Sequence, residues 1–597
     1  MGYYTGWQLA GIPGGIPNVT NVHTIIEALD FNNGEIDAAA AINAAIQSAG
    51  DVASKENIQV VLLSEGIFRI SKTIRMDRSF VVLRGAGIDK TIIRGINAVP
   101  GTIVLGWLDR EGKYPVYHTP AINVLNDLKI GDTKIEVTDA SAFNVGDILK
   151  LDRLADDNGD TYGAAGGTEW LRNGQFFIRN KTNGENGPAS IDGVRPVSQF
   201  IEIEKIEGNT LHLKNKININ FNTKLNSQVW NTNASNYQYI GIEGFKLQTV
   251  EAVKRTSNWD YNPPGISVSL ASSYCWVKDI ESDGKYIDEL GRGFKGQHIR
   301  LNGFRNIVSG CYVHDSQDNR PGGNGYGIQF HGTDSIIENN ICDKLCKPLQ
   351  GYASNGGNVI AYNYVPNTET GSFEGPYPVK LISWMETAID ASHSSYSHSD
   401  LYEGNYAANM STDVTSGNNG LIVFFRNHAW GQNLDQSIPQ IPANDNLAVC
   451  NIAGWNNEHS SIGNVWLNPE TANQPFGTAL WSVPQNKNTE KIAVYSIGNM
   501  TWSIKGKSLD IRGGDFNNWD DGWALEKFFW QYDYNYATEK IESKDTTSKI
   551  SLPDSLYLSN PPAFFENYSW PPVNSFGDSH DQRIGKLPAM QRYMGIH

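Results

Sequence analysis

The fold of this chain is decided by six short segments that share one pattern: IIENNICD (336–343), VIAYNYVP (359–366), LYEGNYAA (401–408), VFFRNHAW (423–430), SIGNVWLN (461–468) and SIGNMTWS (496–503). Each segment has apolar residues, a small or polar pair, an asparagine and then another apolar or aromatic residue. Short strands that recur every ~20–25 residues, with longer loops inserted between some of them, are typical of a solenoid. The sequence therefore predicts stacked coils of short parallel strands.

The shared asparagine of these segments is predicted to be structural. Asparagine accepts left-handed turns, and its amide can bond the equivalent residue in the next coil, which satisfies backbone groups at a bend. We therefore expect an internal asparagine ladder, with few contacts to a substrate, formed by Asn340, Asn363, Asn405, Asn427, Asn464 and Asn499.

The amino-terminal part predicts how the first end of the solenoid is closed. An alanine-rich helix is expected over 36–49, with Asp37 near its start, and paired strands are expected over 60–76 and 80–95. A helix at this place covers core and strand edges that the first coil would otherwise expose. Residues 30–95 resemble the cap and first coils of the pectate-lyase-like superfamily. The match rests on the Asp-Ala-Ala helix, the EGIFRI strand and the LRGAG turn followed by TII.

That resemblance implies an all-β fold, a right-handed parallel β-helix with an amino-terminal capping helix. The region after the first coils has a different pattern. In 122–153 and 201–217 apolar and polar residues alternate, as in antiparallel strands. This pattern predicts a small inserted β-domain. A helix is also expected over 524–536. The predicted division is a cap with first coils (1–121), the inserted domain (122–220), the main β-helix with a loop-walled groove (221–510) and a carboxy-terminal cap (511–597).

Composition excludes several classes of function. The chain of 597 residues carries a formal net charge of −16, which argues against a nucleic-acid partner, since such proteins need a basic face. It has no apolar run long enough to insert into a membrane. The start, MGYYTGWQLAGIPGG, lacks the features of a signal peptide. The expected location is secreted or at the cell surface, with a leader removed, or else a phage virion. Of the five cysteines, Cys275, Cys311 and Cys450 are expected to be buried free thiols, and Cys342 and Cys346 alone do not make a zinc site.

Three polar clusters on the long loops are candidates for chemistry. They lie after 314, over 384–403 and over 413–430. The predicted catalytic residues are Asp315, Asp318, Glu386, Asp390, His393 and Arg426. The predicted substrate-binding residues are Arg320, Tyr326, His331, Trp384, Asp413, His428 and Trp430.

Two cleavage chemistries stay open at this point. A polysaccharide lyase needs a base and a cationic group that stabilises the anion, supplied by Arg, Lys or Ca²⁺. A glycoside hydrolase needs two carboxyls on opposite sides of the bond. Ca²⁺ is the only cofactor considered, and no metal ligands are assigned. The G-H-G and R-I-K signatures of polygalacturonases are absent, as are the W-I-D-H and R-x-P-x-x-R signatures of classical pectate lyases.

The resemblance therefore implies a fold and a polysaccharide partner, and it does not imply a particular reaction. The alternative to a glycan-cleaving enzyme is a glycan-binding phage tailspike, which is expected to be a trimer, or a surface adhesin. A third hypothesis is a purely structural solenoid.

Overall fold

The structure is a computed structural model. It describes residues 4–97, 101–106, 121–154, 197–232, 236–251, 263–270, 272–320, 323–352, 356–372, 380–382, 385–393, 397–412, 419–438, 449–453, 456, 458–472, 481–482, 495–499, 528–544 and 551–596.

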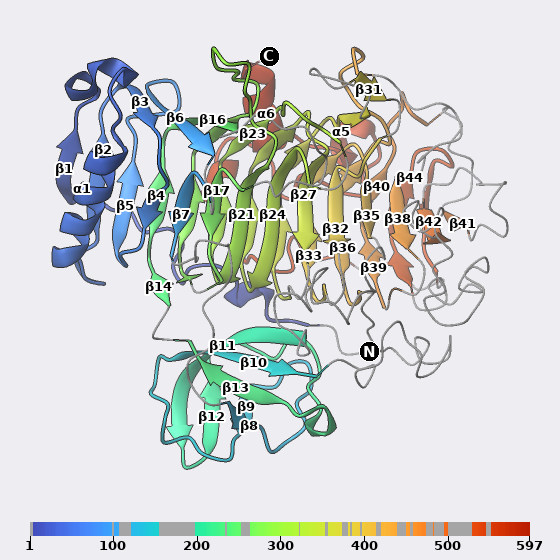
Figure 1. The fold of residues 1–597 in the computed structure, drawn as a ribbon. Coiled ribbons are helices and arrows are strands. Elements are labelled where there is room, and N and C mark those ends of the chain that lie inside the picture. Colours follow the sequence, from blue (N-terminus) through green and yellow to red (C-terminus); the bar gives the residue numbers. More distant parts are fainter. Residues whose placement is uncertain are drawn as a thin grey trace.

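Three long parallel sheets form the body of the molecule (Figure 1). Sheet A contains β1 (Val22–Ile26), β2 (Gln59–Leu63), β5 (Val81–Arg84), β15 (Gly241–Glu243), β19 (Trp276–Lys278), β22 (Ile307–Ser309), β25 (Ile336–Glu338), β28 (Val359–Ala361), β33 (Leu401–Glu403), β36 (Val423–Phe425), β39 (Ser460–Ile462) and β43 (Phe529–Gln531). Sheet B contains β3 (Gly66–Ile70), β6 (Thr91–Asn97), β16 (Lys246–Glu251), β20 (Glu281–Asp283), β23 (Tyr312–His314), β26 (Ile341–Asp343), β29 (Tyr364–Val365), β34 (Tyr406–Ala407), β37 (His428–Ala429), β40 (Val465–Trp466), β44 (Asp533–Asn535) and the antiparallel β45 (Lys540–Glu542).

Sheet C contains β4 (Ile74–Met76), β7 (Ile103–Leu105), β17 (Ile266–Val268), β21 (Gln297–Phe304), β24 (Tyr326–Thr333), β27 (Lys347–Tyr352), β32 (Ile389–His393), β35 (Met410–Thr412), β38 (Cys450–Ala453), β42 (Tyr495–Asn499) and β41 (Trp481–Ser482), with β14 (Tyr237–Gln238) and β18 (Ser272–Ser273) at its side. Each coil passes through A, then B, then C, and each strand pairs in parallel with its counterpart in the next coil. The predicted right-handed parallel β-helix is therefore confirmed.

The core of the β-helix is a stack of side chains from equivalent positions. In sheet A, for example, Ile242, Val277, Val308, Ile337 and Ile360 face inward at matching register and are fully buried. Such stacking lets each coil cover the apolar surface of its neighbour, which no single coil could bury alone.

The asparagine ladder lies at the bend between sheets A and B. The backbone N–H of Asn340 donates to Asn363 Oδ1 at 3.0 Å, and the same bond links Asn363 to Asn405. The ladder continues through Asn427 and Asn464. The prediction was wrong for the sixth segment, since Asn499 lies in β42 of sheet C, and Asp533 accepts the next bond instead.

A second ladder runs along the bend between sheets C and A. The N–H of Ser335 donates to Asn358 Oδ1 and that of Asn358 donates to Asp400 Oδ1, both at 2.9 Å. The same position holds Asn306 one coil earlier and His459 at the far end, where Nδ1 accepts from the Ile422 N–H. Each step satisfies a buried backbone donor at a turn.

Helix α1 (Ala39–Val52) closes the first end, as predicted. Its apolar side, with Ile42, Ile46 and Ala49 fully buried, covers the first coils, and the N–H of Ala39 donates to Asp37 Oδ1 at 2.7 Å. At the other end the expected helix over 524–536 is wrong in its described part, because this stretch forms β43 and β44 of the last coil. Its aromatic residues alternate, and this period of two suits strands.

The insert between β7 and β14 is a six-stranded sheet with antiparallel pairing: β8 (Ile122–Asn123), β13 (Gln228–Asn231), β10 (Ile148–Arg153), β11 (Val197–Glu207), β12 (Thr210–Leu213) and β9 (Lys134–Glu136). Leu149, Leu151, Ile201 and Ile203 contribute to its own core. It lies beside the β-helix at the ends of the sheet C strands (Figure 1). We call it the inserted domain.

A carboxy-terminal segment (551–596), with α5 (His580–Arg583) and α6 (Pro588–Ile596), runs back over sheets A and B. Arg592 donates to Asn339 Oδ1 at 2.8 Å and Tyr593 to Asp343 Oδ2 at 3.1 Å. All five cysteines are buried free thiols, as predicted for Cys275, Cys311 and Cys450. No helix among the described residues has the length and apolar character needed to cross a membrane.

Candidate functional site

The outer faces of sheets A and B are largely closed by the chain itself in the later coils. Glu403 of sheet A accepts from the Leu556 N–H at 2.8 Å, and Tyr406 of sheet B donates to the carbonyls of Pro572 and Gly585. The guanidinium of Arg583 lies 3.8 Å from the ring centre of Tyr534. The carboxy-terminal segment therefore occupies the surface that a ligand would need on these two faces.

Sheet C has a different outer face, on which one polar side chain follows another at matching register. Between these positions the strands place apolar residues such as Ile328, Leu349 and Ile389 into the core. Figure 1 shows the strands β21 to β38 side by side. We call this set the polar row; its members are Ser267, Arg300, Gln329, Gln350, Asp390, Ser411 and Asn451.

A buried lysine bridges two carboxylates at the middle of the polar row. Lys347 Nζ lies 2.7 Å from Asp390 Oδ2 and 3.4 Å from Glu386 Oε2. Gln350 Nε2 donates to Asp390 Oδ2 at 3.0 Å and accepts at Oε1 from Gln329 at 2.6 Å. We call Lys347, Gln350, Glu386 and Asp390 the Lys347 cluster. A chain of hydrogen bonds therefore orients its carboxylates from one coil to the next.

Two rings lie beside this cluster. His393 Nδ1 is 4.0 Å from Asp390 Oδ2, and the His393 ring stacks with that of Tyr352 at 5.9 Å between centres and 28° between planes. Both rings are half-buried. A partly exposed aromatic pair offers an apolar face next to charged groups, which suits the amphipathic surface of a sugar.

Several buried polar atoms on this face have no protein partner. They include Asn302 Oδ1, His331 Nδ1, Asp390 Oδ1 and Asn451 Oδ1. Burial, helped by the charges of Arg300 and Lys150, lowers the pKa of His331 to about 3, so its imidazole is neutral near pH 7. An unpartnered buried polar atom is costly, and it has a natural partner in a ligand hydroxyl or in water.

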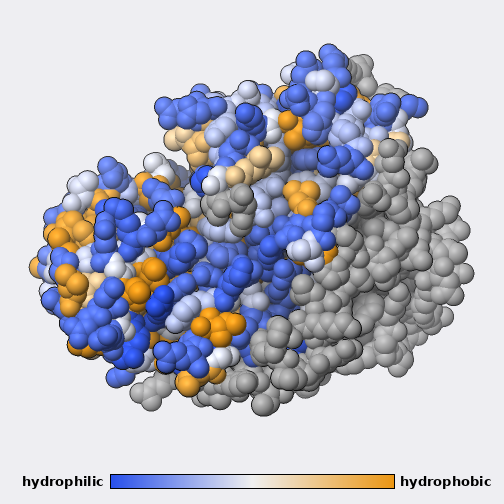
Figure 2. Space-filling model, turned by 90° about the horizontal axis from the view of Figure 1, so that it is seen from above, coloured by the Kyte–Doolittle hydropathy of each residue, from blue (hydrophilic) through white to orange (hydrophobic). Residues whose placement is uncertain are grey.

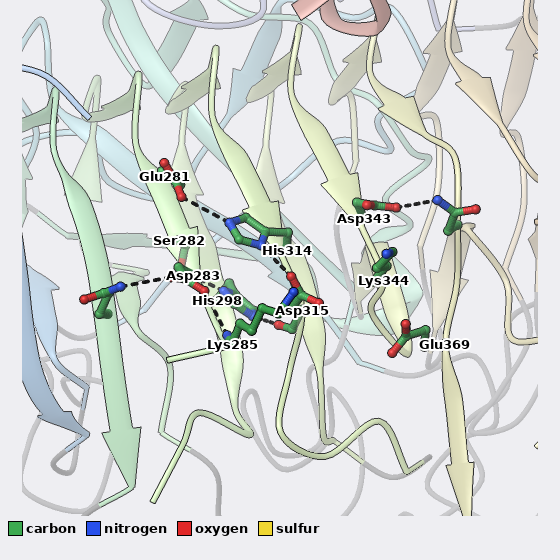
Figure 3. A network of polar contacts seen from close by, with 12 residues as sticks. Glu281, Ser282, Asp283, Lys285, His298, His314, Asp315, Asp343, Lys344 and Glu369 are labelled. Atoms are coloured by element: carbon green, nitrogen blue, oxygen red, sulfur yellow. Dashed lines mark hydrogen bonds and ion pairs between the residues drawn. The ribbon is translucent and has the colours of Figure 1, made fainter. Parts of the chain in front are cut away.

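A second network lies where sheet B turns toward sheet C (Figure 3). His314 donates from Nδ1 to Asp315 Oδ2 at 2.7 Å, and its Nε2 lies 3.3 Å from Glu281 Oε1. Burial would lower the pKa of His314, but the hydrogen bonds to Asp315 and Glu281 outweigh it and raise the pKa to about 9. Burial, with Asp315 adding to it, raises the pKa of Glu369 to about 7. This corner network joins oppositely charged groups and holds Asp315 in place.

His298 extends the same network inward. Burial lowers its pKa to about 3, so the ring is neutral. The His298 Nε2 donates to the carbonyl of Asp315 at 2.9 Å, and its Nδ1 accepts from Ser282 at 2.7 Å.

Seen from above in Figure 2, hydrophilic residues cover the middle of the described surface, with apolar residues in separate patches. A polar ligand suits such a surface.

The predicted site residues fall into separate groups. Glu386, Asp390 and His393 meet at the Lys347 cluster, and His331 lies on the same sheet. Tyr326 lies at the start of β24, where its burial raises the pKa of the phenol against the opposing charge of Lys347. Asp318 and Arg320 form a buried ion pair in the loop before β24, and Asp315 belongs to the corner network.

The remaining predicted residues lie elsewhere. Arg426 is on the far side of the coil, where it donates to the carbonyls of Leu552, Pro553 and Val573. His428 is buried in sheet B, where Nδ1 bonds the Val465 carbonyl, and burial lowers its pKa to about 4. The structure does not bring these residues to the Lys347 cluster. The buried Trp430 is nearby, 5.6 Å from His428 between ring centres. Trp384 and Asp413 lie outside the described residues.

Sequence reasoning missed Lys347, Gln350, Gln329 and Tyr352. They lie within the short strands β24 and β27, not on the long loops. A signal exists for two of them: Gln329 lies between Ile328 and Phe330, and Gln350 follows Leu349 at the matching position of the next coil. Among the described residues, no three or more His, Cys, Asp or Glu side chains gather to hold a metal ion.

Comparisons with known proteins give solved structures of low similarity and no family. No protein-family model matches this sequence, and a search of curated proteins finds no match. Among solved structures, the tailspike of Pseudomonas phage phi297 is 10% identical over 74% of this chain and 65% of its own, with a TM-score of 0.41. The match therefore covers less than two thirds of that tailspike.

Two enzymes also match. They are the A-module of the mannuronan C-5 epimerase AlgE4 from Azotobacter vinelandii (9% identity, 74% of this chain, 88% of that one, TM-score 0.30) and DFA-IIIase from Arthrobacter chlorophenolicus A6 (9%, 74%, 84%, TM-score 0.34). At this identity the likeness concerns the fold alone.

Proposed function

We propose that this protein is an extracellular carbohydrate-active enzyme that cleaves a polysaccharide lying across the outer face of sheet C. The observation that carries the proposal is the pair of carboxylates, Glu386 and Asp390, held by Lys347 in the middle of the polar row. Arg300 and Asn451 are the partly exposed members of the polar row and can bond sugar hydroxyls directly, while the buried Gln329 and Gln350 hold Asp390 in position. Of the two carboxyls, one can attack the bond between two sugar units while the other protonates the departing oxygen.

Glycoside hydrolysis is the reaction that this geometry supports best. Because Lys347 Nζ is 3.4 Å from Glu386 Oε2 and 2.7 Å from Asp390 Oδ2, these two oxygens lie no more than about 6 Å apart. Retaining glycosidases place their carboxyls about 5–5.5 Å apart and inverting ones about 6.5–9.5 Å apart. The bound on the separation favours retention of configuration.

The two carboxyls differ in a way that assigns their roles. Asp390 has the closer contact with Lys347 and accepts from Gln350 as well, so its position is fixed, which suits the nucleophile. Glu386 has the longer contact and suits the acid. Asp390 would form an ester with the anomeric carbon while Glu386 protonates the departing oxygen. Glu386 would then take a proton from the water that cleaves this ester.

A second candidate reaction rests on His393. Its ring is partly exposed and lies 4.0 Å from the Asp390 oxygen that Lys347 also contacts. His393 could therefore remove the proton alpha to a uronate carboxylate while the Lys347 ammonium stabilises the resulting anion. Loss of the leaving sugar would give an unsaturated product, which absorbs ultraviolet light. A glycan-binding tailspike or adhesin would use the same polar row without cleavage, and a tailspike is expected to be a trimer.

The test is a panel of neutral and uronic polysaccharides incubated with the purified full chain. Reducing ends report hydrolysis, ultraviolet absorbance of the product reports elimination, and light scattering reports the oligomeric state. Glu386→Gln and Asp390→Asn should each lower the rate by about a hundredfold or more. Glu65→Gln, which changes an exposed carboxylate far from sheet C, is the matched control. Unchanged cleavage by both site variants would overturn the assignment.

A further inference from the structure

The carboxy-terminal segment leaves the first coils of sheet B uncovered. Arg592 and Tyr593 of α6 contact the chain at β26, and Figure 1 shows β3, β6 and β16 next to one another on the side of α6 that faces the amino-terminal cap. On these strands Arg69 is exposed, and Arg94 and Gln248 are partly exposed. This part of the outer face of sheet B is therefore open to a ligand.

Two arginines stand side by side on this open face. Arg69 of β3 pairs in register with Arg94 of β6, and Arg94 pairs in register with Gln248 of β16. Phe68 and Ile93, which precede the two arginines, are fully buried in the core, so the arginines point outward. Neighbouring strands are about 4.8 Å apart, so the two like charges repel each other, and an anion bound beside them would remove that repulsion.

The guanidinium of Arg94 is held in one orientation by hydrogen bonds. Its Nε donates to Gln248 Oε1 at 2.9 Å, and the Gln248 amide is itself oriented because Nε2 donates to Asp283 Oδ2 at 3.0 Å. Asp283 lies next to the corner network (Figure 3), and its Oδ1 accepts from the Lys285 N–H at 2.9 Å. A chain of hydrogen bonds thus fixes Arg94 from two strands away.

An aromatic ring lies against the same guanidinium. Tyr286 is in the loop between β20 and β21, and its ring centre is 4.9 Å from Arg94 Cζ. This loop is held by Asp288, whose Oδ1 accepts from the N–H of Leu290 at 3.1 Å and from that of Arg292 at 2.9 Å. The cation–π contact restricts the guanidinium further, and the partly exposed ring offers an apolar face beside it.

Arg94 keeps two nitrogens for a ligand. Its contacts with the described residues are the bond to Gln248 and the contact with Tyr286, so Nη1 and Nη2 have no acceptor in that part of the chain. The carboxylates around this row have other partners: Asp283 accepts from Gln248, and Asp37, whose backbone bridges to Arg69, accepts from a helix N–H. In a chain with a net charge of −16, such a group supplies the local attraction that an acidic polymer needs.

We propose that Arg94, held by Gln248 and Tyr286, binds the carboxylate of an acidic glycan on the outer face of sheet B, at a second binding site apart from the one on sheet C. The planar fork of Nη1 and Nη2 suits a bidentate bond with a carboxylate, and Arg69 adds positive charge next to it. The Tyr286 ring gives the sugar an apolar face, which a compact anion would not use. Because the guanidinium is already fixed, little affinity is lost to ordering. The inference rests on the proposed function for the kind of polymer, since the glycan held here is the one that the site on sheet C would cleave.

The experiment measures binding and does not depend on cleavage. Calorimetry on the full chain compares oligogalacturonate and oligomannuronate with their carboxyl-reduced, neutral forms, and inorganic sulfate serves as a compact anion. The wild type should bind at least one acidic form more tightly than its neutral form. Arg94→Gln should weaken binding of that acidic form about tenfold and leave the neutral form unchanged. Arg94→Lys, which keeps the charge without the planar fork, should lose part of the affinity, and Lys134→Gln, at an exposed lysine of the inserted domain, is the control.

Three outcomes would overturn the inference. One is equal affinity of the wild type for the acidic and neutral forms of both glycans, a result that needs no variant. Another is a folded Arg94→Gln protein that binds the acidic form as the wild type does. The third is binding of inorganic sulfate as tight as that of the oligosaccharides, which would make this a site for any anion. If Arg94→Gln weakens binding but the wild type cleaves no glycan, the site on sheet B holds and the proposed hydrolysis fails.

Discussion

The backbone N–H of Asn464 donates to Asp533 Oδ1 at 2.7 Å, so an aspartate takes the last described step of a ladder that asparagines form in the preceding coils. The Asn464 amide also donates to the same oxygen at 3.0 Å. A carboxylate can end the ladder because the residue at this position only has to accept the hydrogen bond from the backbone N–H of the preceding coil. The ladder is thus a device for satisfying backbone donors at a bend.

Removal of one ladder residue should destabilise the β-helix strongly. In Asn405→Ala the N–H of Asn363 loses its acceptor, and the Ile360 carbonyl loses a donor, both in the buried interior. We expect a loss of about 2–4 kcal/mol, measured as a lower urea midpoint. Asn560→Ala, at an exposed position, is the control. Equal midpoints for the two variants would contradict a structural role of the ladder.

Replacement of Arg426 should loosen the carboxy-terminal segment. Arg426→Gln removes charged donors to the carbonyls of Pro553 and Val573 and costs about 3 kcal/mol locally. Limited proteolysis should therefore cut within 551–596 faster, while cleavage of glycan by the folded protein is retained. Arg69→Gln, at an exposed arginine, is the control. If Arg426→Gln lost glycan cleavage but kept normal protease resistance, Arg426 would have to be assigned to the active site.

Stability should fall as the pH rises from mildly acidic to basic. Burial raises the pKa of Glu338 and of Glu403 to about 7 in the folded protein, above the usual pKa of a glutamate. Between these pKa values the two carboxyls bind more protons in the folded state than in the unfolded state, so the stability that they contribute is lost as the pH rises through about 7. The neutral His298, His331 and His428 act in the opposite sense, but only below the usual pKa of a histidine, so the decline dominates above neutral pH. The melting temperature should be lower at about pH 8.5 than at about pH 5.5.

The double variant Glu338→Gln, Glu403→Gln should reduce this slope, because a neutral amide does not titrate. The slope should not vanish, since burial also raises the pKa of Asp334 and of Glu369 to about 7. A slope in the wild type that is flat or reversed would show that these carboxyls are ionised in the folded protein.

Truncation of Tyr352 should weaken substrate binding more than catalysis. Its ring stacks with His393 beside the Lys347 cluster, and a stacking platform for a sugar is worth about 1–1.5 kcal/mol. Tyr352→Ala should raise KM by about tenfold with kcat little changed, whereas Tyr352→Phe, which keeps the ring, should resemble the wild type. A large fall in kcat with unchanged KM would place Tyr352 in the chemistry instead.

The sequence predicts the scaffold well because its signals are repeated. The same residue type, asparagine, occupies the equivalent position in successive coils, as at Asn340, Asn363 and Asn405. The apolar residues around it are repeated as well. The second ladder is hard to predict because one structural position is filled by different residue types. Asn306, Ser335, Asn358, Asp400 and His459 accept hydrogen bonds there, and Ile422, in the coil between the last two, contributes only its backbone N–H. A repeated letter does not mark such a position.

The candidate site was predicted only in part, for a physical reason. Glu386, Asp390 and His393 are close in sequence and were grouped on that basis. Lys347, which holds the two carboxylates, is one coil away, and nothing in the sequence states which residues of neighbouring coils come into register. Arg426 directly follows a strand, a position where catalytic residues are often found. Its partners are carbonyls of the carboxy-terminal segment, and the sequence does not show where that segment runs.

Both ends of the chain reach the same coil in the middle of the solenoid. Tyr4 donates to Asp334 Oδ1 at 2.9 Å just before β25, and Arg592 binds Asn339 just after it. In an ordinary solenoid each coil contacts only its neighbours, so stability is a sum of local steps and the ends can fray independently. Here the terminal segments couple distant coils directly. The β-helix should therefore unfold as one cooperative unit. A change that weakens either terminal segment should also lower the stability of the central coil.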